Sequence, residues 1–319
     1  MRVQHLLNSR WFAIPGPAFV GLGMVALIVW VLKDYGWSLF LALPFGVSFL
    51  ASFCFSYRRE VKVRAAYGVA VLSLLLLGAA IMVFAIDGLI CLLMALPLAL
   101  AIGAAGAFLG SYIGMSIGLA ERGMGGPAAP LLLILLLPAS VALDHATKSP
   151  AGLRMVTTHV AVAAPAARIW PVVISFPRIA EAPEDIFRLG IAYPIEARIE
   201  GTGVGAIRNC VFSTGSFVEP ITAWEEPLRL AFDVTAQPEP MRELSIYEHV
   251  DAPHLHGFMV SERGQFRLIE QAGRTLLEGT TWYRHDLAPG WYWGPISDMI
   301  IHRIHQRVLT HIQRTVEAG

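Results

Sequence analysis

The sequence predicts a chain of two unlike parts. Residues 1–148 form an α-helical membrane bundle of about five spans, and residues 149–319 form an α+β domain with a curved antiparallel sheet and a long C-terminal helix. Charge is the first evidence: residues 1–150 carry 14 charged side chains and a net charge of +4, whereas the rest carry 34 and a net charge of −4. The pattern of hydrophobic residues is the second evidence. Long uncharged apolar runs give way after Pro150 to short alternating segments separated by glycine and proline.

The composition excludes several classes of protein. A hydrophobic content of 55% and a mean hydropathy of +0.57 exclude a single soluble domain. No part of the chain of domain size is strongly basic, so we expect no nucleic-acid partner. The three cysteines, Cys54, Cys91 and Cys210, are too few and too scattered to form a disulfide scaffold.

The first part contains apolar runs long enough to cross a bilayer, since about 20 helical residues span its hydrocarbon core. We expect spans in the runs Ile14–Leu32, Trp37–Tyr57, Ala65–Ile86, Gly88–Ala120 and Ala128–Leu143. The fourth run is too long for one upright helix, and the fifth is short for a span. Glycines recur in the fourth run at Gly103, Gly106, Gly110, Gly114 and Gly118. Such spacing lets helix backbones approach closely in lipid, so these glycines predict close helix packing.

Basic residues predict the orientation of the spans. With the N-terminus inside, the inner segments hold seven Lys and Arg residues, and the short outer loops hold only Lys33. Five spans then place the C-terminal domain of this inner- or plasma-membrane protein outside the cytoplasm, whereas four would leave it inside. No predicted span carries an ionisable residue, because Asp87 falls at a turn between two runs. Transporters and pumps usually keep such residues in their pathways, so the first part reads as an anchor.

The second part predicts a mixed domain. A first strand, Met155–Val162, is followed by two short helices, Pro165–Ile174 and Pro183–Ala192, each opened by a proline. A long helix, Pro295–Glu317, closes the chain. Between them, six runs bounded by glycine or proline predict strands: Ile195–Glu200, Val204–Thr214, Ser216–Trp224, Leu228–Thr235, Gly257–Glu270 and Thr275–Asp286.

This order of elements resembles the START-like, or SRPBCC, superfamily, which includes polyketide cyclases/dehydrases, lipid-transfer START domains and the birch-pollen-allergen group. The resemblance covers about residues 155–317. It is carried by three stretches: HVAVAAPAARIWPVV (His159–Val173), GVGAIRNCVFSTGSFVEPITAWEEPLRLAF (Gly203–Phe232) and GQFRLIEQAGRTLLEGTTWY (Gly264–Tyr283). It implies a helix-grip fold with a cavity for a hydrophobic small molecule between the sheet and the long helix. It does not imply a reaction, because this fold hosts binding proteins and enzymes alike.

Candidate site residues gather on the last helix. His305 falls within its apolar stripe, His302 lies at the edge of the stripe, and Asp298 lies one turn earlier. Three interpretations stay open: a core histidine bonded to the sheet, a polar anchor or general acid/base in the ligand pocket, or a metal site. No second ligand cluster clearly completes a metal site, so we expect no metal and no cofactor.

Further candidates lie on the predicted strands. Arg208 and Cys210 share one strand face; an inward Arg208 would pair with a ligand carboxylate, Glu219 or Glu278, and an outward one would be an ordinary surface arginine. Cys210 fits a small buried side chain better than a nucleophile. Trp282 and Tyr283, with the aromatic residues at 291–293, are assigned either to the cavity mouth or to the membrane interface.

Three functions follow from these observations. We favour a membrane-anchored binding protein for a hydrophobic small molecule, either a lipid or a polyketide-like compound. The second is a cyclase, dehydratase or hydrolase-type enzyme that uses His305 with Asp298 or Arg208. The third is a structural or assembly protein whose cavity is filled by side chains. Whether the protein is an enzyme, and its oligomeric state, stay open.

Overall fold

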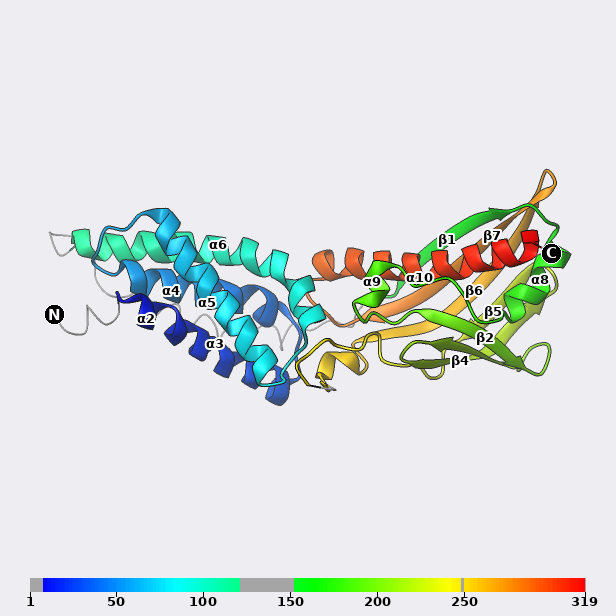
Figure 1. The fold of residues 1–319 in the computed structure, drawn as a ribbon, viewed down its shortest axis with the longest axis horizontal. Coiled ribbons are helices and arrows are strands. Elements are labelled where there is room, and N and C mark those ends of the chain that lie inside the picture. The colour runs from blue at the N-terminus through cyan, green and yellow to red at the C-terminus, as the bar shows by residue number, and fades with distance from the viewer. Residues whose placement is uncertain (1–7, 121–151, 248–249, 319) are drawn as a thin grey trace. The chain divides into compact units, whose positions relative to one another are not determined.

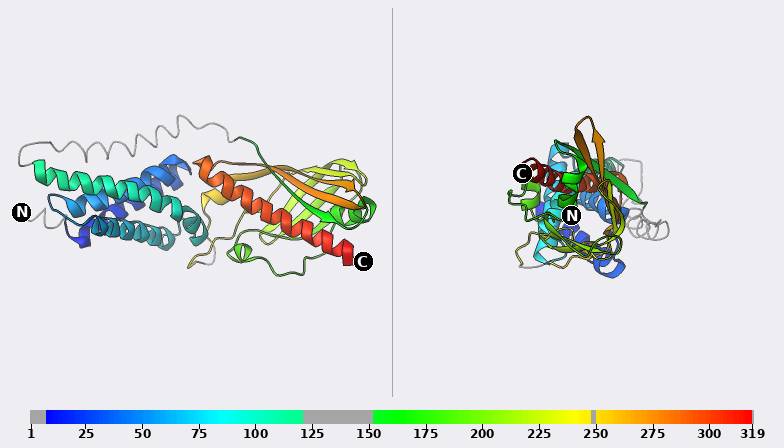
Figure 2. Two further views of the ribbon diagram at one scale, coloured as in Figure 1. Left: turned by 90° about the horizontal axis from the view of Figure 1, so that it is seen from above. Right: turned by 90° about the vertical axis from the view of Figure 1, so that its right-hand side faces the viewer.

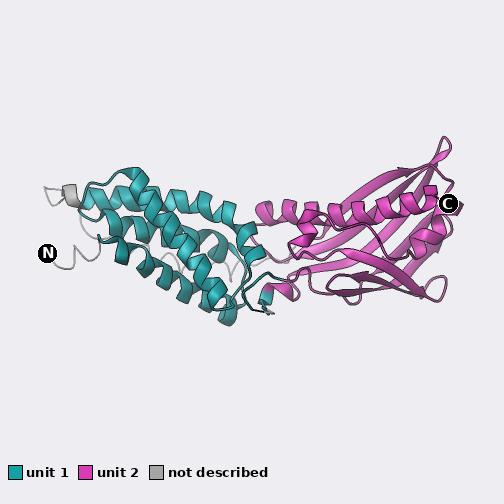
Figure 3. Ribbon diagram, in the orientation of Figure 1, with its two compact units in different colours: residues 1–149, 243–253 teal, residues 150–242, 254–319 magenta. Residues whose placement is uncertain are grey.

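The computed structural model describes residues 8–120, 152–247 and 250–318 (Figure 1). The chain divides into two compact units (Figure 3). The first comprises residues 1–149 and 243–253, and the second comprises residues 150–242 and 254–319. The boundary near residue 150 therefore separates the helical part from the sheet, and the segment 243–253 joins the helical unit although it lies between two strands.

Apolar helices joined by short turns build the first unit. They are α2 (Arg10–Ala13), α3 (Pro15–Ala26), α4 (Leu43–Ser56), α5 (Val63–Val83) and α6 (Leu89–Ala120), with π-helical turns η1 (Leu27–Leu32) and η2 (Ser38–Ala42). Four helical stretches are long and apolar enough to cross a membrane: Arg10–Leu32, Ser38–Ser56, Val63–Val83 and Leu89–Ile117. They coincide with the first four predicted spans. The fifth predicted span, Ala128–Leu143, lies outside the described residues.

The glycines of α6 face α4 at close range. A Cβ atom on Gly106 would clash with the carbonyl oxygen of Phe45, and one on Gly110 would clash with that of Phe49. Gly114 meets the Ser56 hydroxyl in the same way. Any side chain at these positions would force the two backbones apart, so the glycine spacing serves helix packing as the sequence predicts.

A carboxylate from the strand-rich part of the sequence caps α6. Glu243 is buried, and its two oxygens accept hydrogen bonds from the backbone amides of Ile90 at 3.0 Å and Cys91 at 3.2 Å. The amide of Leu89 donates to the carbonyl oxygen of Leu244 at 2.8 Å. These contacts satisfy amides that have no partner within the helix, and the negative charge complements the positive end of the helix dipole.

A seven-stranded antiparallel sheet forms the body of the second unit. Its strands are β1 (Arg154–Val162), β2 (Pro194–Glu200), β3 (Ile207–Phe212), β4 (Gly215–Glu225), β5 (Arg229–Asp233), β6 (Met259–Gln271) and β7 (Arg274–His285). Their order across the sheet is β1-β7-β6-β5-β4-β3-β2. Each predicted strand overlaps one of these, and every neighbouring pair in the sheet is antiparallel.

The long helix α10 (Gly290–Ala318) lies along the concave face of this sheet (Figure 2). Its predicted apolar stripe is buried, with Leu309 and Ile312 fully enclosed in a core that also contains Trp170 of α8 (Ala166–Ile174). A curved antiparallel sheet that holds one long C-terminal helix is the predicted helix-grip arrangement. The helix begins five residues before the predicted start, so Pro295 lies inside it.

One helix prediction was wrong in extent. The proline-led run Pro183–Ala192 forms only the short helix α9 (Asp185–Arg188). Gly190 adopts a φ of 113°, which ends the helix, and Ile191 instead bridges to Met241 as an isolated strand pair. Long-range pairing with residues 240–241 thus overrides the local helical pattern. A single turn of 3-10 helix, η3 (Pro253–Leu255), precedes β6.

We predict that Gly110→Leu destabilises the helical unit, because its side chain would meet the backbone of α4. Forced overpacking costs about 1–3 kcal/mol. Thermal unfolding of the detergent-purified protein should show a lower Tm for this variant. The matched control is Gly78→Leu on α5, where no atom lies within 4 Å of the added Cβ. An equal loss of stability in both variants would contradict a close α4–α6 contact.

Candidate functional site

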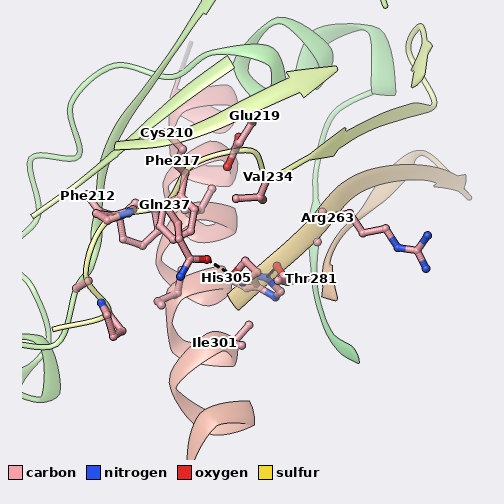
Figure 4. A pocket seen from close by; sticks show the side chains of 18 of the residues that line it. Cys210, Phe212, Phe217, Glu219, Val234, Gln237, Arg263, Thr281, Ile301 and His305 are labelled. Atoms are coloured by element: carbon pink, nitrogen blue, oxygen red, sulfur yellow. Dashed lines mark hydrogen bonds between the residues drawn. The ribbon is translucent and has the colours of Figure 1, made fainter. Parts of the chain in front are cut away.

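A cavity of about 150 Å³ lies between the sheet and α10. Aromatic side chains of the sheet, among them Phe212, Phe217 and Phe266, form one wall. Ile304 and Val308 of α10 face them from the other side. The interior of the domain is therefore not filled by its own side chains, and the walls that surround the space are mainly apolar (Figure 4).

The chain after β5 closes a further side of the cavity. Gln237 reaches across to β6, where its amide nitrogen donates to the carbonyl oxygen of Met259 at 2.6 Å and its amide oxygen accepts from the backbone of Ser261 at 2.8 Å. The Pro240 carbonyl oxygen accepts a hydrogen bond from the amide of Ala192 at 3.0 Å. These bonds hold residues 237–241 as a fixed wall. We call this segment the strap.

Arg208 points into the domain and is fully buried. Its guanidinium forms an ion pair with Glu219 on the neighbouring strand, and its Nε donates to the carbonyl oxygen of Ile174 at 3.1 Å. The rings of Phe232 and Phe266 each lie 5.5 Å from the guanidinium carbon. Of the three partners that the sequence allowed for an inward arginine, the structure contains the pair with Glu219.

Cys210 lies two residues along the same strand face and lines the cavity. Burial raises the pKa of its thiol to about 12, and the nearby Glu219 charge acts in the same direction. The thiol is therefore protonated at neutral pH, whereas a nucleophilic cysteine needs its thiolate form. The geometry agrees with a small buried side chain in the cavity wall.

His305 lies at the junction of α10, β1 and β7, beside Thr281 (Figure 4). Its Nε2 is 2.7 Å from the Thr281 hydroxyl, and its Nδ1 is 3.2 Å from the Thr158 hydroxyl. The same Thr158 hydroxyl lies 2.7 Å from Nδ1 of His302, which is on the exposed side of the helix. Burial, with a smaller contribution from His302, lowers the pKa of His305 to about 4, so its ring is neutral at physiological pH.

Asp298 has a different set of partners. It forms an ion pair with Arg154 at the start of β1 and accepts a hydrogen bond from the Tyr283 hydroxyl at 2.6 Å. Burial would raise the pKa of Asp298, but the hydrogen bonds from Arg154 and Tyr283 outweigh this effect and lower it. Asp298 and His302 therefore share a helix face in sequence but not a site, because the carboxylate is engaged elsewhere.

Like Asp298 and His302, three candidates on strand β7 do not line the cavity. Glu278 lies opposite Arg267 on the outer face of the sheet, with 3.9 Å between their charged atoms. Trp282 also points outward, and the guanidinium of Arg263 lies 4.8 Å from its ring. Tyr283 points inward but is fully buried against Asp298. Strand alternation places Glu278 and Trp282 on the face of the sheet opposite the cavity. Tyr283 is on the same face as the cavity but lies beside Asp298, outside the cavity lining.

Other residues of this region were missed at the level of sequence. Thr158 and Thr281 are single threonines on β strands, and nothing in their local pattern distinguishes them from other strand threonines. The strap residues carry a clear signal in the pair Pro238 and Pro240, which predicts an extended segment but not its position over a cavity. Glu219 entered only as one of several partners for Arg208.

No family model matches the chain, and no curated protein matches it. Among solved structures, truncated norcoclaurine synthase from Thalictrum flavum is similar over 54% of this chain and 99% of its own, with 13% identity and a TM-score of 0.35. Zhui aromatase/cyclase from Streptomyces sp. R1128 is similar over 52% of this chain and 94% of its own, with 17% identity and a TM-score of 0.34. Ara h 8.0201 shows 11% identity over 53% of this chain and all of its own, with a TM-score of 0.31. At such low identities and TM-scores these similarities assign neither a ligand nor an activity.

We predict that Glu219→Gln destabilises the second unit by about 3–5 kcal/mol, because it leaves the Arg208 charge buried without a counter-charge. Replacing both residues, as Arg208→Met with Glu219→Leu, should restore most of the loss, since no buried charge remains. Urea unfolding followed by tryptophan fluorescence measures both effects. The control is Glu225→Gln, which breaks the exposed pair with Arg229 and should cost less than about 1 kcal/mol. Equal costs for the buried and exposed pairs would contradict this account.

Proposed function

We propose that the second unit binds a hydrophobic small molecule in the cavity between its sheet and α10. The apolar space of about 150 Å³ in the core carries this proposal. Protein interiors pack as densely as organic crystals, and this partly open pocket departs from that density. A sequence under selection for stability alone would fill it. The alternative of a structural protein with a filled interior therefore finds no support.

The size of the cavity narrows the choice of ligand. A cavity of about 150 Å³ in another protein accommodates one benzene-sized molecule, whereas pockets for drug-sized ligands measure about 300–1,000 Å³. The space thus suits a single ring or a short branched chain. A diacyl lipid or a fused-ring polyketide would enter only in part, so among hydrophobic compounds we favour a small ligand.

The helical unit would serve as a membrane anchor. Its four apolar stretches carry no charged side chain between their ends apart from the first turn of two of them, where Arg10 and Arg64 lie. No charged pathway for ions or protons is therefore evident within the described spans. The first unit supplies attachment to a bilayer, and the chemistry of recognition lies in the second.

We infer that the second unit lies outside the cytoplasm. The segment 243–253 leaves the second unit at residue 242, returns to it at residue 254, and caps the start of α6 through Glu243. With the N-terminus inside, the excess of basic residues places the start of α6 at the outer surface. A segment that docks at the outer end of α6 must come from a domain on that side.

Binding of phenol to the full-length protein tests the cavity. Calorimetry should show that Val308→Phe weakens phenol binding at least tenfold, because the new ring occupies the space from the α10 side. Val204→Phe is the matched control, since Val204 is 68% exposed in the loop between β2 and β3. Equal affinity of the wild type and Val308→Phe for phenol would show that phenol does not bind in the cavity.

Cysteine labelling of intact cells tests the orientation. In a background with Cys54, Cys91 and Cys210 replaced by alanine, a membrane-impermeant maleimide should label Val204→Cys without lysis. Glu60→Cys, in the exposed turn between α4 and α5, should react only after lysis. The reverse pattern would place the second unit in the cytoplasm.

A further inference from the structure

Four side chains connect the outer surface of α10 with the cavity through a continuous series of hydrogen bonds. His302 is exposed, and its Nδ1 lies 2.7 Å from the hydroxyl of the buried Thr158. That hydroxyl lies 3.2 Å from Nδ1 of His305, whose Nε2 lies 2.7 Å from the hydroxyl of Thr281. His305 and Thr281 both line the cavity. The series thus begins in solvent and ends at the ligand space.

The chemistry of a single hydroxyl couples the two histidines. Thr158 has one proton to donate, yet it lies between two ring nitrogens of the same type. If it donates to His302, His305 must carry its proton on Nδ1 and accept from Thr281 at Nε2. If it donates to His305, His302 must carry its proton on Nδ1, and His305 donates from Nε2 to Thr281. The two rings therefore change tautomer together.

The tautomers of the two histidines determine whether Thr281 accepts or donates a hydrogen bond on the cavity side. When Thr281 donates to His305, its free lone pairs can accept a proton donor such as a phenol or enol. When it accepts from His305, its own proton can be donated to a carbonyl oxygen. The depressed pKa of His305 keeps the ring neutral, which both states require. The same four side chains can thus bind a ligand oxygen that donates a proton or a ligand oxygen that accepts one.

We propose that His302, Thr158, His305 and Thr281 form a proton relay between solvent and a cavity ligand that bears a hydroxyl or carbonyl oxygen. The proposal rests on the proposed binding function and names the chemistry of its ligand. In one step, the ligand O–H gives its proton to Thr281, Thr281 gives its own to Nε2 of His305, and Nδ1 of His305 gives a proton to Thr158. Thr158 then gives its proton to Nδ1 of His302, which releases one from Nε2 to water. The ligand oxygen keeps the electron pair as an oxyanion, and the reverse direction protonates it.

Nitrogen NMR of the full-length protein with ¹⁵N-labelled histidine, in lipid nanodiscs at mildly alkaline pH, tests the relay. The probes are phenol, a proton donor, and cyclohexanone, which only accepts; they have rings of the same size. With phenol, His305 should carry its proton on Nδ1 and His302 on Nε2. With cyclohexanone, both assignments should invert. A histidine that only ties α10 to the sheet would keep one tautomer with both probes.

Two variants on the same strand separate the relay from a general effect of substitution. Thr158→Val removes the shared hydroxyl, so His302 should no longer respond to the ligand while His305 still does. Thr157→Val makes the same change one residue earlier, where the side chain meets Thr280 on the outer face of the sheet, and should leave the inversion intact. Bound probes with unchanged tautomers would overturn the relay and leave the binding function standing. Failure of both probes to bind, measured by calorimetry, would overturn the binding function and the relay together.

Discussion

The packing of one amphipathic helix into the concave face of the sheet is the constraint on which the second unit depends. The second half of α10 meets both the sheet and α8, and there Leu309 and Ile312 are completely enclosed. In the middle of the helix, the side chains of Ile304 and Val308 border a cavity. The same contact that stabilises the domain therefore leaves space within it, because a straight helix and a curved sheet do not match along their whole length. The strap closes what the helix does not cover.

Two polar side chains in this interior, Arg208 and His305, have hydrogen-bond partners on the sheet. Arg208 is surrounded by aromatic rings and bonded to Glu219 and to a carbonyl oxygen, which offsets much of the cost of burying its charge. His305 uses both ring nitrogens with threonine hydroxyls from two different strands. These two groups occupy the cavity walls without filling the cavity. An apolar space with a few fixed polar groups is the usual form of a site for a small hydrophobic ligand.

The helical unit follows a different principle, in which small residues let helix backbones approach closely. Close approach of α4 and α6 depends on the glycines of α6, at whose positions a single methyl group would meet a backbone carbonyl or a serine hydroxyl. At the start of α6, the backbone amides of Ile90 and Cys91 donate hydrogen bonds to Glu243, which lies far away in the sequence. A buried carboxylate at a helix start both satisfies free amides and complements the helix dipole, so this contact links the segment between β5 and β6 to the helical unit.

The sequence by itself determined the four described apolar stretches, the strands and the long final helix, because hydrophobic periodicity and glycine or proline punctuation are local signals. It placed His305 within the apolar stripe of the last helix and left open which face of the sheet Arg208 and Cys210 occupy. Tertiary structure alone decided the rest. Strand register brought Thr158 and Thr281 to the two nitrogens of His305, and long-range pairing with the strap shortened the helix expected at 183–192. Asp298 was drawn to Arg154 and Tyr283 instead of joining His302. These outcomes depend on contacts between residues that are not neighbours in the sequence, and local periodicity carries no information about such contacts.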